Sequence, residues 1–179
     1  DLRYDPKEIK RLLDENHIEA SSICGVYSTE RDFVSADPVI RAQAVQYVKD
    51  LADFASAIGA KAISIQASAC MKINAQASFE EEWAWAVEGI REAGIYAGEK
   101  NINLTLEAWN RYETYFINRL DQALKMVNEI DLPNVGVMGD TYHMNIEEVD
   151  MGEALRNVGD KLYYLHIADS NRAAPGRGH

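Results

Sequence analysis

Two hydrophobic patterns alternate along the chain. In one, apolar residues recur three or four positions apart, which is typical of an amphipathic helix; in the other, short apolar runs predict buried strands. The helical pattern predicts helices that start at Asp5-Pro6, Asp37-Pro38 and Ser78, and further helices over Phe116–Ile130 and Asn145–Val158. The apolar runs predict five strands, which are Ile18–Ile23, Ala62–Gln66, Asn103–Glu107, Val135–Asp140 and Leu162–Ile167.

Capping residues support these helix boundaries. Asp5 and Asp37 each precede a proline, which favours the first turn of a helix. Ser78 and Glu81 have the spacing of a capping box, and Gly59 is a typical stop residue. The local signals therefore agree with the hydrophobic pattern.

The order of the elements predicts an α/β fold. Strands separated by single helices need crossover connections, which give a mainly parallel sheet. A complete (β/α)8 barrel takes about 250 residues. The 179 residues here hold five predicted strands, so we expect a partial TIM barrel, with residues 1–179 as a single domain that is incomplete at both ends.

Charge and composition narrow the class of partner. The formal net charge is −11 at pH 7, which disfavours binding to nucleic acid or to an anionic membrane surface. Hydrophobic residues make up 47% of the chain, enough for a globular core. We therefore expect a small-molecule partner.

The cysteines indicate a reducing compartment. Cys24 and Cys70 are too few for a disulfide framework and form no C-x-x-C pair, so we expect a cytoplasmic protein. No apolar run approaches the length of about 20 residues that a transmembrane helix needs. The start of the sequence also lacks the apolar stretch of a signal peptide.

Three predicted strands end in a polar residue that faces the same side of the sheet. Side chains alternate along a strand, so Leu104 and Leu106 would pack on helices while Glu107 would face the other way. The same alternation applies to Asp140 and His166. In barrels of parallel strands, the carboxyl ends of the strands carry the chemistry.

Two carboxylates and an imidazole make a coordination sphere for a divalent ion. Glu107, Asp140 and His166 suit Mn²⁺ first, with Co²⁺ or Mg²⁺ as alternatives. Zinc is less favoured because no thiolate or second ligand histidine is evident. The alternative interpretation is structural, because a single glutamate at a strand end is more often solvated or paired with a helix terminus.

Further polar residues follow the same strand ends. Trp109 and Glu113 lie in the segment after Glu107, His143 follows Asp140 by three residues, and Arg172 lies after His166. Imidazole and guanidinium groups can hold the oxygens of a polyhydroxyl ligand or stabilise a developing enolate. Taken alone, Arg172 would more often be a surface ion-pair partner.

Three segments of the chain resemble the ketose 3-epimerases, of the D-tagatose and D-psicose 3-epimerase type, which are xylose-isomerase-like TIM barrel enzymes. The resemblance covers most of the chain from Ile18 onward. The segments that carry it are Leu-Glu-Ala-Trp-Asn-Arg-Tyr-Glu at 106–113, Asp-Thr-Tyr-His-Met-Asn-Ile-Glu-Glu at 140–148, and His-Ile-Ala-Asp-Ser-Asn-Arg at 166–172 with Pro-Gly-Arg-Gly at 175–178.

The resemblance implies a (β/α)8 barrel in which the five strands are the third through seventh. It implies that Glu107, Asp140 and His166 bind the metal, and that Glu107 is one of two glutamates that transfer a proton at C3 of a ketose through a cis-enediolate. Glu113, His143 and Arg172 match residues that hold the sugar. The second glutamate lies on the eighth strand of the family, which this chain lacks, so these residues alone would turn over little. The family also implies a homo-oligomer.

One departure from the family concerns the substrate. Ala108 and Trp109 stand where the epimerases usually carry smaller aliphatic residues, so the indole of Trp109 would narrow the pocket or cover a face of the sugar. The alternatives are a dehydratase acting on a polyol ketone, a phosphodiesterase acting on abasic DNA, and a non-catalytic sugar-binding or assembly domain. The net charge of −11 counts against the DNA enzyme.

Overall fold

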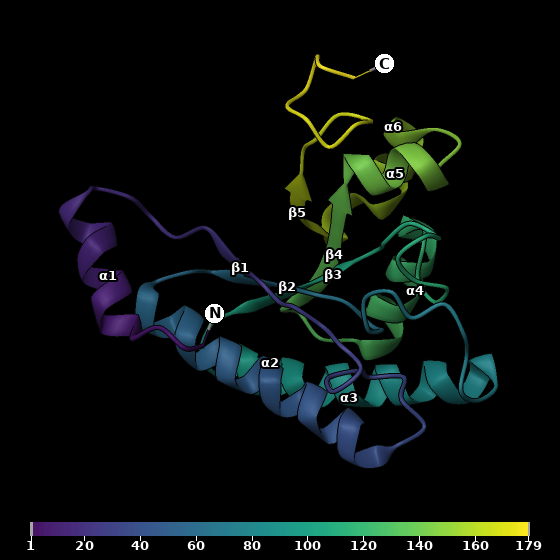
Figure 1. Ribbon diagram of the computed structural model, residues 1–179, viewed down its shortest axis with the longest axis horizontal. Coiled ribbons are helices and arrows are strands. Elements are labelled where there is room, and N and C mark those ends of the chain that lie inside the picture. Colours follow the sequence, from purple (N-terminus) through teal and green to yellow (C-terminus); the bar gives the residue numbers. More distant parts are fainter. Residues whose placement is uncertain (1, 179) are drawn as a thin grey trace.

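A computed structural model describes residues 2–178 and contains one parallel sheet with helices packed along it (Figure 1). The elements are, in chain order, α1 (Pro6–Glu15), β1 (Ser22–Cys24), α2 (Pro38–Ile58), β2 (Ala62–Ile65), α3 (Phe79–Glu99), β3 (Asn103–Glu107), α4 (Leu120–Ile130), β4 (Val135–Asp140), α5 (Thr141–Glu147), α6 (Met151–Val158), a 3-10 turn (Gly159–Lys161) and β5 (Leu162–His166).

The sheet has the strand order β1-β2-β3-β4-β5, and every neighbouring pair is parallel. Consecutive strands are therefore also neighbours in space, as in one arc of a barrel. The predicted α/β class is confirmed, and the five strands form a parallel half-barrel. This order brings the ends of β3, β4 and β5 side by side.

The predicted caps set the helix boundaries. Asp5 and Asp37 each accept a hydrogen bond from the backbone two residues later, with a proline at the start of the helix. Ser78 and Glu81 form both bonds of the capping box at the start of α3. Gly59 ends α2 in the left-handed conformation, at φ 85°, which glycine adopts without strain.

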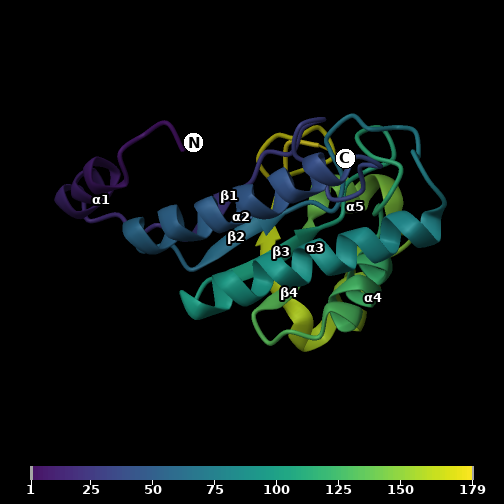
Figure 2. The same ribbon diagram turned by 90° about the horizontal axis from the view of Figure 1, so that it is seen from below.

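The core lies between the sheet and the long helices. Figure 2 shows α2 and α3 running side by side along one face of the sheet, with α1 at the far end of the molecule. Leu104, Leu106, Val135 and Val137 are fully buried in the core cluster, which also contains the apolar face of α4. These strand residues face the helices, as the alternation along the sequence predicts.

Several predicted boundaries differ from the structure, and the second and fifth strands each end one residue earlier than predicted. The first strand covers Ser22–Cys24 rather than Ile18–Ile23, because its neighbour β2 begins pairing only at Ala62, opposite Ser22. Helix α4 begins at Leu120, so Phe116 belongs to the preceding loop although it is buried.

The last predicted helix is two helices. Residue Glu148 adopts an extended conformation at the end of α5, and a new helix starts after Asp150, whose side chain caps it by accepting from Glu153 N. Asn145, the predicted start of this helix, therefore lies inside α5. The break is a tertiary effect, because the carboxylate of Glu148 accepts a hydrogen bond from Leu120 N at the start of α4. Within residues 2–178, every helix is too short or too polar to span a lipid bilayer.

Candidate metal centre

The ends of β3, β4 and β5 bring Glu107, Asp140 and His166 together. One ligand atom from each of these residues lies within 4.8 Å of the other two. The Nδ1 atom of His166 is 3.8 Å from Glu107 Oε1 and 3.8 Å from Asp140 Oδ2. Asp140 and His166 are direct partners in the sheet register. The convergence that strand parity predicts is therefore present in the structure.

Glu107 is held through one oxygen and presents the other to the site, whereas Asp140 is contacted at both oxygens, with Arg172 on Oδ2. Glu107 Oε2 accepts hydrogen bonds from Gln66 Nε2 at 3.1 Å and Ser64 Oγ at 3.2 Å, while Oε1 faces His166. Asp140 Oδ1 accepts from Tyr142 N at 2.9 Å, and Oδ2 faces His166. This arrangement fixes the carboxylates in position before any ion binds.

Local charges shift the pKa values of Glu107 and His166 in opposite directions. Burial by itself raises the pKa of the Glu107 carboxyl, but the interactions with His166 and Trp109 and the nearby imidazoles outweigh it, so its pKa lies below the ordinary value. The pKa of His166 is raised, chiefly by Glu107. Glu107 is only 4% exposed, so its negative charge lies in a poorly solvated place that favours a cation nearby.

The donor set fits a divalent cation. Two carboxylate oxygens and one imidazole nitrogen, close enough to share one ion, match the ligands of Mn²⁺, Co²⁺ and Mg²⁺ better than those of a thiolate-preferring metal. The site lies on an open sheet end, which leaves coordination positions for other ligands. The residues present therefore suit a divalent ion without selecting which one.

His143 and Glu113 lie beside this centre and are joined by Asn110. The His143 side chain, on α5, is 1% exposed, and its Nδ1 is 3.1 Å from Asn110 N and 2.8 Å from Asn110 Nδ2. The same Nδ2 donates to Glu113 Oε1 at 2.9 Å. Burial lowers the pKa of His143, and the nearby carboxylates only partly offset this. A neutral imidazole therefore faces the site.

Trp109 forms one wall next to His143. The indole and imidazole rings are stacked, with centroids 5.7 Å apart and an interplanar angle of 16°. The indole nitrogen is buried. Trp109 therefore lies beside His143 at the edge of the proposed site.

Arg172 reaches back into the site from the loop after β5. Its Nη1 donates to Asp140 Oδ2 at 2.5 Å, and Nη2 lies 2.9 Å from His143 Nε2. The guanidinium also lies over the ring of Tyr142, 4.1 Å from the centroid. Arg172 adopts a left-handed backbone conformation with φ 63°, which turns the side chain toward β4. All seven residues singled out from the sequence thus lie in one region.

Three polar residues of the site were missed by the sequence analysis. Ser64 and Gln66 belong to β2 and its end, and the same alternation that selects Glu107 would have selected them. Asn110 is different, because nothing in its local pattern distinguishes it from a turn residue. Its role depends on a contact with a side chain 33 residues away.

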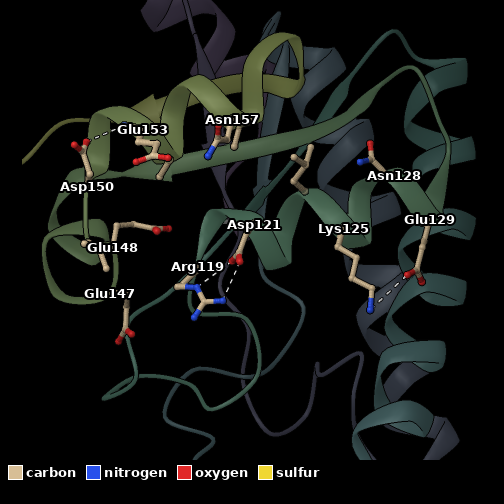
Figure 3. A pocket seen from close by; sticks show the side chains of 14 residues that line it. Arg119, Asp121, Lys125, Asn128, Glu129, Glu147, Glu148, Asp150, Glu153 and Asn157 are labelled. Carbon is tan, nitrogen blue, oxygen red and sulfur yellow. Dashed lines mark hydrogen bonds and ion pairs between the residues drawn. The ribbon is translucent and has the colours of Figure 1, made fainter.

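A large open groove lies elsewhere. An open groove of about 750 Å³ runs between α4 and α6 and contains none of the seven predicted site residues. Four of its charged side chains form ion pairs with one another, Arg119 with Asp121 and Lys125 with Glu129 (Figure 3). The groove has no converging set of ligands comparable to the strand ends, so we place the chemistry at the sheet rim.

Comparison with known proteins gives a consistent result. A model of the xylose isomerase-like TIM barrel family matches residues 1–179. L-ribulose 3-epimerase from Methylomonas sp. is 35% identical over 170 residues, which are 94% of this chain and 59% of that protein. Ketose 3-epimerase from Arthrobacter globiformis is 31% identical, over 98% of this chain and 60% of that protein.

A solved structure shows the same arrangement of elements. D-allulose 3-epimerase from Methylomonas sp., in complex with D-allulose, superposes with a TM-score of 0.91 at 34% identity, covering 98% of this chain and 60% of that one. The chain therefore spans about three fifths of the length of these three relatives.

Proposed function

The chain belongs to the xylose isomerase-like TIM barrel family, and from this premise we propose that the protein is a divalent-metal-dependent sugar epimerase that inverts C3 of a ketose. The observation that carries the proposal is the convergence of Glu107, Asp140 and His166 at the ends of three adjacent strands. The epimerase names of its relatives support the reaction class. Because the chain spans only part of their length, the activity is proposed for the whole protein.

The strand order supports a specific place in the barrel. We assign β1 to β5 to the third through seventh strands of a (β/α)8 barrel, with residues 1–179 as part of one domain. In this assignment Glu107, Asp140 and His166 end the fifth, sixth and seventh strands. A second glutamate, at the end of the eighth strand of the family, would complete the site.

Glu107, Asp140 and His166 would hold the ion, and we favour Mn²⁺. A divalent ion in this position supplies positive charge that makes the hydrogen next to a ketose carbonyl more acidic. Glu107 Oε1, which is not engaged by Ser64 or Gln66, is the oxygen that would take the C3 proton. Its lowered pKa keeps it unprotonated at neutral pH, as a base must be.

The neighbouring side chains would bind the sugar. His143 and Arg172 present nitrogen atoms 2.9 Å apart, a spacing that suits two contacts to one sugar oxygen and would hold the negative charge of an enediolate. Glu113 offers a carboxylate to a hydroxyl group. Trp109 would lie against the sugar and exclude water from that side.

A Mn²⁺ titration tests the metal assignment. The affinity of the unmodified chain is compared with that of Glu107→Gln, which removes a ligand oxygen without changing the shape of the side chain. We expect a loss of at least about 100-fold, because even supporting residues cost 10–100-fold. Glu113→Gln is the matched control and should bind Mn²⁺ normally. Equal affinity in the native chain and Glu107→Gln would remove the metal assignment.

Isotope exchange tests the reaction. The full-length protein is incubated with Mn²⁺ and D-allulose in deuterated water, and an epimerase should place deuterium at C3. A product lighter by one water would indicate a dehydratase instead. Sugar binding without metal and without exchange would indicate a binding domain.

We also propose that the protein acts in the cytoplasm as a homo-oligomer. The support for the homo-oligomer is the similarity of the chain to the ketose 3-epimerases. Light scattering coupled to size exclusion measures this directly, and a monomeric mass at micromolar concentration would contradict it.

A further inference from the structure

The orientation of the Asn110 side chain is determined by its neighbours. Tyr112 N donates to Asn110 Oδ1 at 3.0 Å, and a backbone N–H can only donate. Asn110 Nδ2 lies 2.9 Å from Glu113 Oε1, and an ionised carboxylate can only accept. A flipped amide would place two donors together on one side and two acceptors on the other. The amide nitrogen therefore faces His143 and Glu113.

This orientation places two hydrogen-bond donors against one nitrogen of His143. The backbone N–H of Asn110 is 3.1 Å from His143 Nδ1, and the side-chain Nδ2 is 2.8 Å from the same atom. Neither group can accept a hydrogen bond, so Nδ1 must offer its lone pair. A neutral imidazole with an unprotonated Nδ1 carries its hydrogen on Nε2.

The opposite nitrogen of the ring then faces another donor. His143 Nε2 lies 2.9 Å from Arg172 Nη2, and a guanidinium has no acceptor. Two N–H groups this close do not satisfy each other, and both can donate to one oxygen atom that contacts the two nitrogens from the side. A ketose offers such an oxygen as its carbonyl or as a hydroxyl. The other terminal nitrogen of Arg172, Nη1, donates to Asp140, and this contact fixes the direction of Nη2.

We propose that Asn110 is a positioning residue that holds His143 in the Nε2–H tautomer and ties Glu113 to the same amide, so that His143 and Arg172 donate together to one oxygen of the sugar. The role of the sugar in this inference rests on the proposed function, whereas the tautomer does not. In this arrangement His143 is a hydrogen-bond donor and not the base that removes the C3 proton. That task stays with Glu107.

The tautomer is measured by NMR on the chain labelled with ¹⁵N-histidine, without metal or sugar. Two-bond ¹H–¹⁵N correlations distinguish a protonated from an unprotonated ring nitrogen, and the spectrum of His143→Gln identifies the His143 signals. We expect Nδ1 at the shift of an unprotonated nitrogen and Nε2 at that of a protonated one. The reverse pattern, or averaged shifts, would overturn the inference. Because no metal or sugar is present, the result does not depend on epimerase activity.

The variant Asn110→Asp tests the side chain. It keeps the size of Asn110 but replaces the Nδ2 donor, at 2.8 Å, with a charged acceptor that outweighs the longer backbone contact at 3.1 Å. Nδ1 of His143 should therefore gain a proton, and its shift should move to the protonated range. Asn118→Asp is the matched control, because Asn118 Nδ2 donates to Trp109 O at 2.7 Å and Thr114 O at 2.9 Å in the same loop.

Asn118→Asp should leave the His143 shifts unchanged. If both variants change the tautomer equally, the effect comes from the loop and the role of Asn110 is refuted. If Asn110→Asp leaves the native pattern, the side chain does not set the tautomer and the proposal also fails. The native spectrum remains a test on its own if Asn110→Asp does not fold.

Discussion

The loops after β1, β2 and β3 differ from the loop after β5 in how they are held. The first three are interlocked through buried polar contacts. Lys72 pairs with Asp32 at 2.7 Å, with side chains only 9% and 4% exposed, and Ala69 N also donates to Asp32. Met71 N donates to Glu113 O at 2.7 Å, which links the loop after β2 to the site itself.

The loop after β5 is organised mostly by its own residues. Asp169 accepts hydrogen bonds from the backbone of Ser170, Gly176 and Arg177 in the same loop. Its links to the rest of the molecule include Thr141, which bonds to Ala168, and the Arg172 side chain on Asp140. This loop therefore keeps its shape without depending on the neighbouring loops.

The difference separates two kinds of site residue. Glu107, Asn110 and Glu113 are positioned by an interlocked set of loops and by a sheet with partners on both sides, so their geometry is part of the stability of the fold. The side chains of His166 and Arg172 are 40% and 45% exposed, and they come from β5, the last strand of the described residues, and from the self-contained loop after it. Substitutions that disturb the loops after β1, β2 and β3 should lower stability, whereas substitutions in β5 and the loop after it should lower function alone.

The largest expected effect comes from breaking the buried ion pair between Lys72 and Asp32. Lys72→Met removes the partner of Asp32 and leaves a buried, uncompensated carboxylate, which costs about 3–5 kcal/mol of unfolding free energy. Urea denaturation followed by circular dichroism measures the loss. Lys49→Met breaks the more exposed pair with Glu92 and is the control for loss of a lysine.

Asp169→Asn makes the corresponding lesion in the self-contained loop. The backbone groups of that loop hold the pKa of Asp169 at about 2, so the carboxylate is ionised throughout the neutral range. Its loss should shift the urea midpoint far less than Lys72→Met does. Equal shifts from the two variants would show that the two regions contribute alike, and the comparison would then be wrong.

An intermediate effect is expected from the support of Glu107. Gln66→Leu removes the 3.1 Å hydrogen bond to Glu107 Oε2 while leaving all three proposed ligands in place. Loss of such a supporting contact should weaken Mn²⁺ binding by about 10–100-fold, measured by calorimetric titration. Gln76→Leu is the control, since Gln76 accepts from Ala36 N and touches none of the ligands. Unchanged Mn²⁺ affinity in Gln66→Leu would show that Gln66 does not orient Glu107.

The smallest effect concerns acid stability. Burial alone raises the pKa of Glu147, but Arg111 outweighs this through a two-oxygen contact, and the pKa lies below the ordinary value of 4.5. A lowered pKa means that the stabilisation is complete above pH 4.5 and is lost as the pH falls through the folded-state pKa.

The stability difference between the native chain and Glu147→Gln should therefore be about 0.5–1 kcal/mol at neutral pH and should shrink in acid. Urea midpoints measured from pH 7 to pH 3 test this. Glu88→Gln, at an exposed position of α3, should show no such trend. A difference that grows as the pH falls would contradict the assignment.

Much of the fold follows from local chemistry. Proline after Asp5 and Asp37 and the capping box at Ser78 predict helix starts that the structure contains. The alternation along β3 and β4 predicts which side chains reach the inner face, because the two-residue period of a strand leaves no freedom once one face is buried. Glu107 and Asp140 were found on this basis.

Other features depend on contacts between distant residues. The break after α5 arises because the Glu148 carboxylate bonds to Leu120 N, 28 residues earlier, and no local pattern contains that bond. Asn110 becomes part of the site only because the fold places His143, on α5, next to it. The position of Arg172 is set in the same way, by Asp140 across the site.

The contact between Arg172 and Asp140 has a consequence for the affinity of the site. The guanidinium donates to Oδ2, the same oxygen that faces His166, so an arriving ion meets a carboxylate whose charge is already partly neutralised. Arg172 and the ion then compete for that oxygen, so the affinity for the ion depends on how easily the Arg172 side chain moves away from it. A substitution that shortens the side chain at Arg172 would therefore remove a group of the protein that competes with the ion for Asp140.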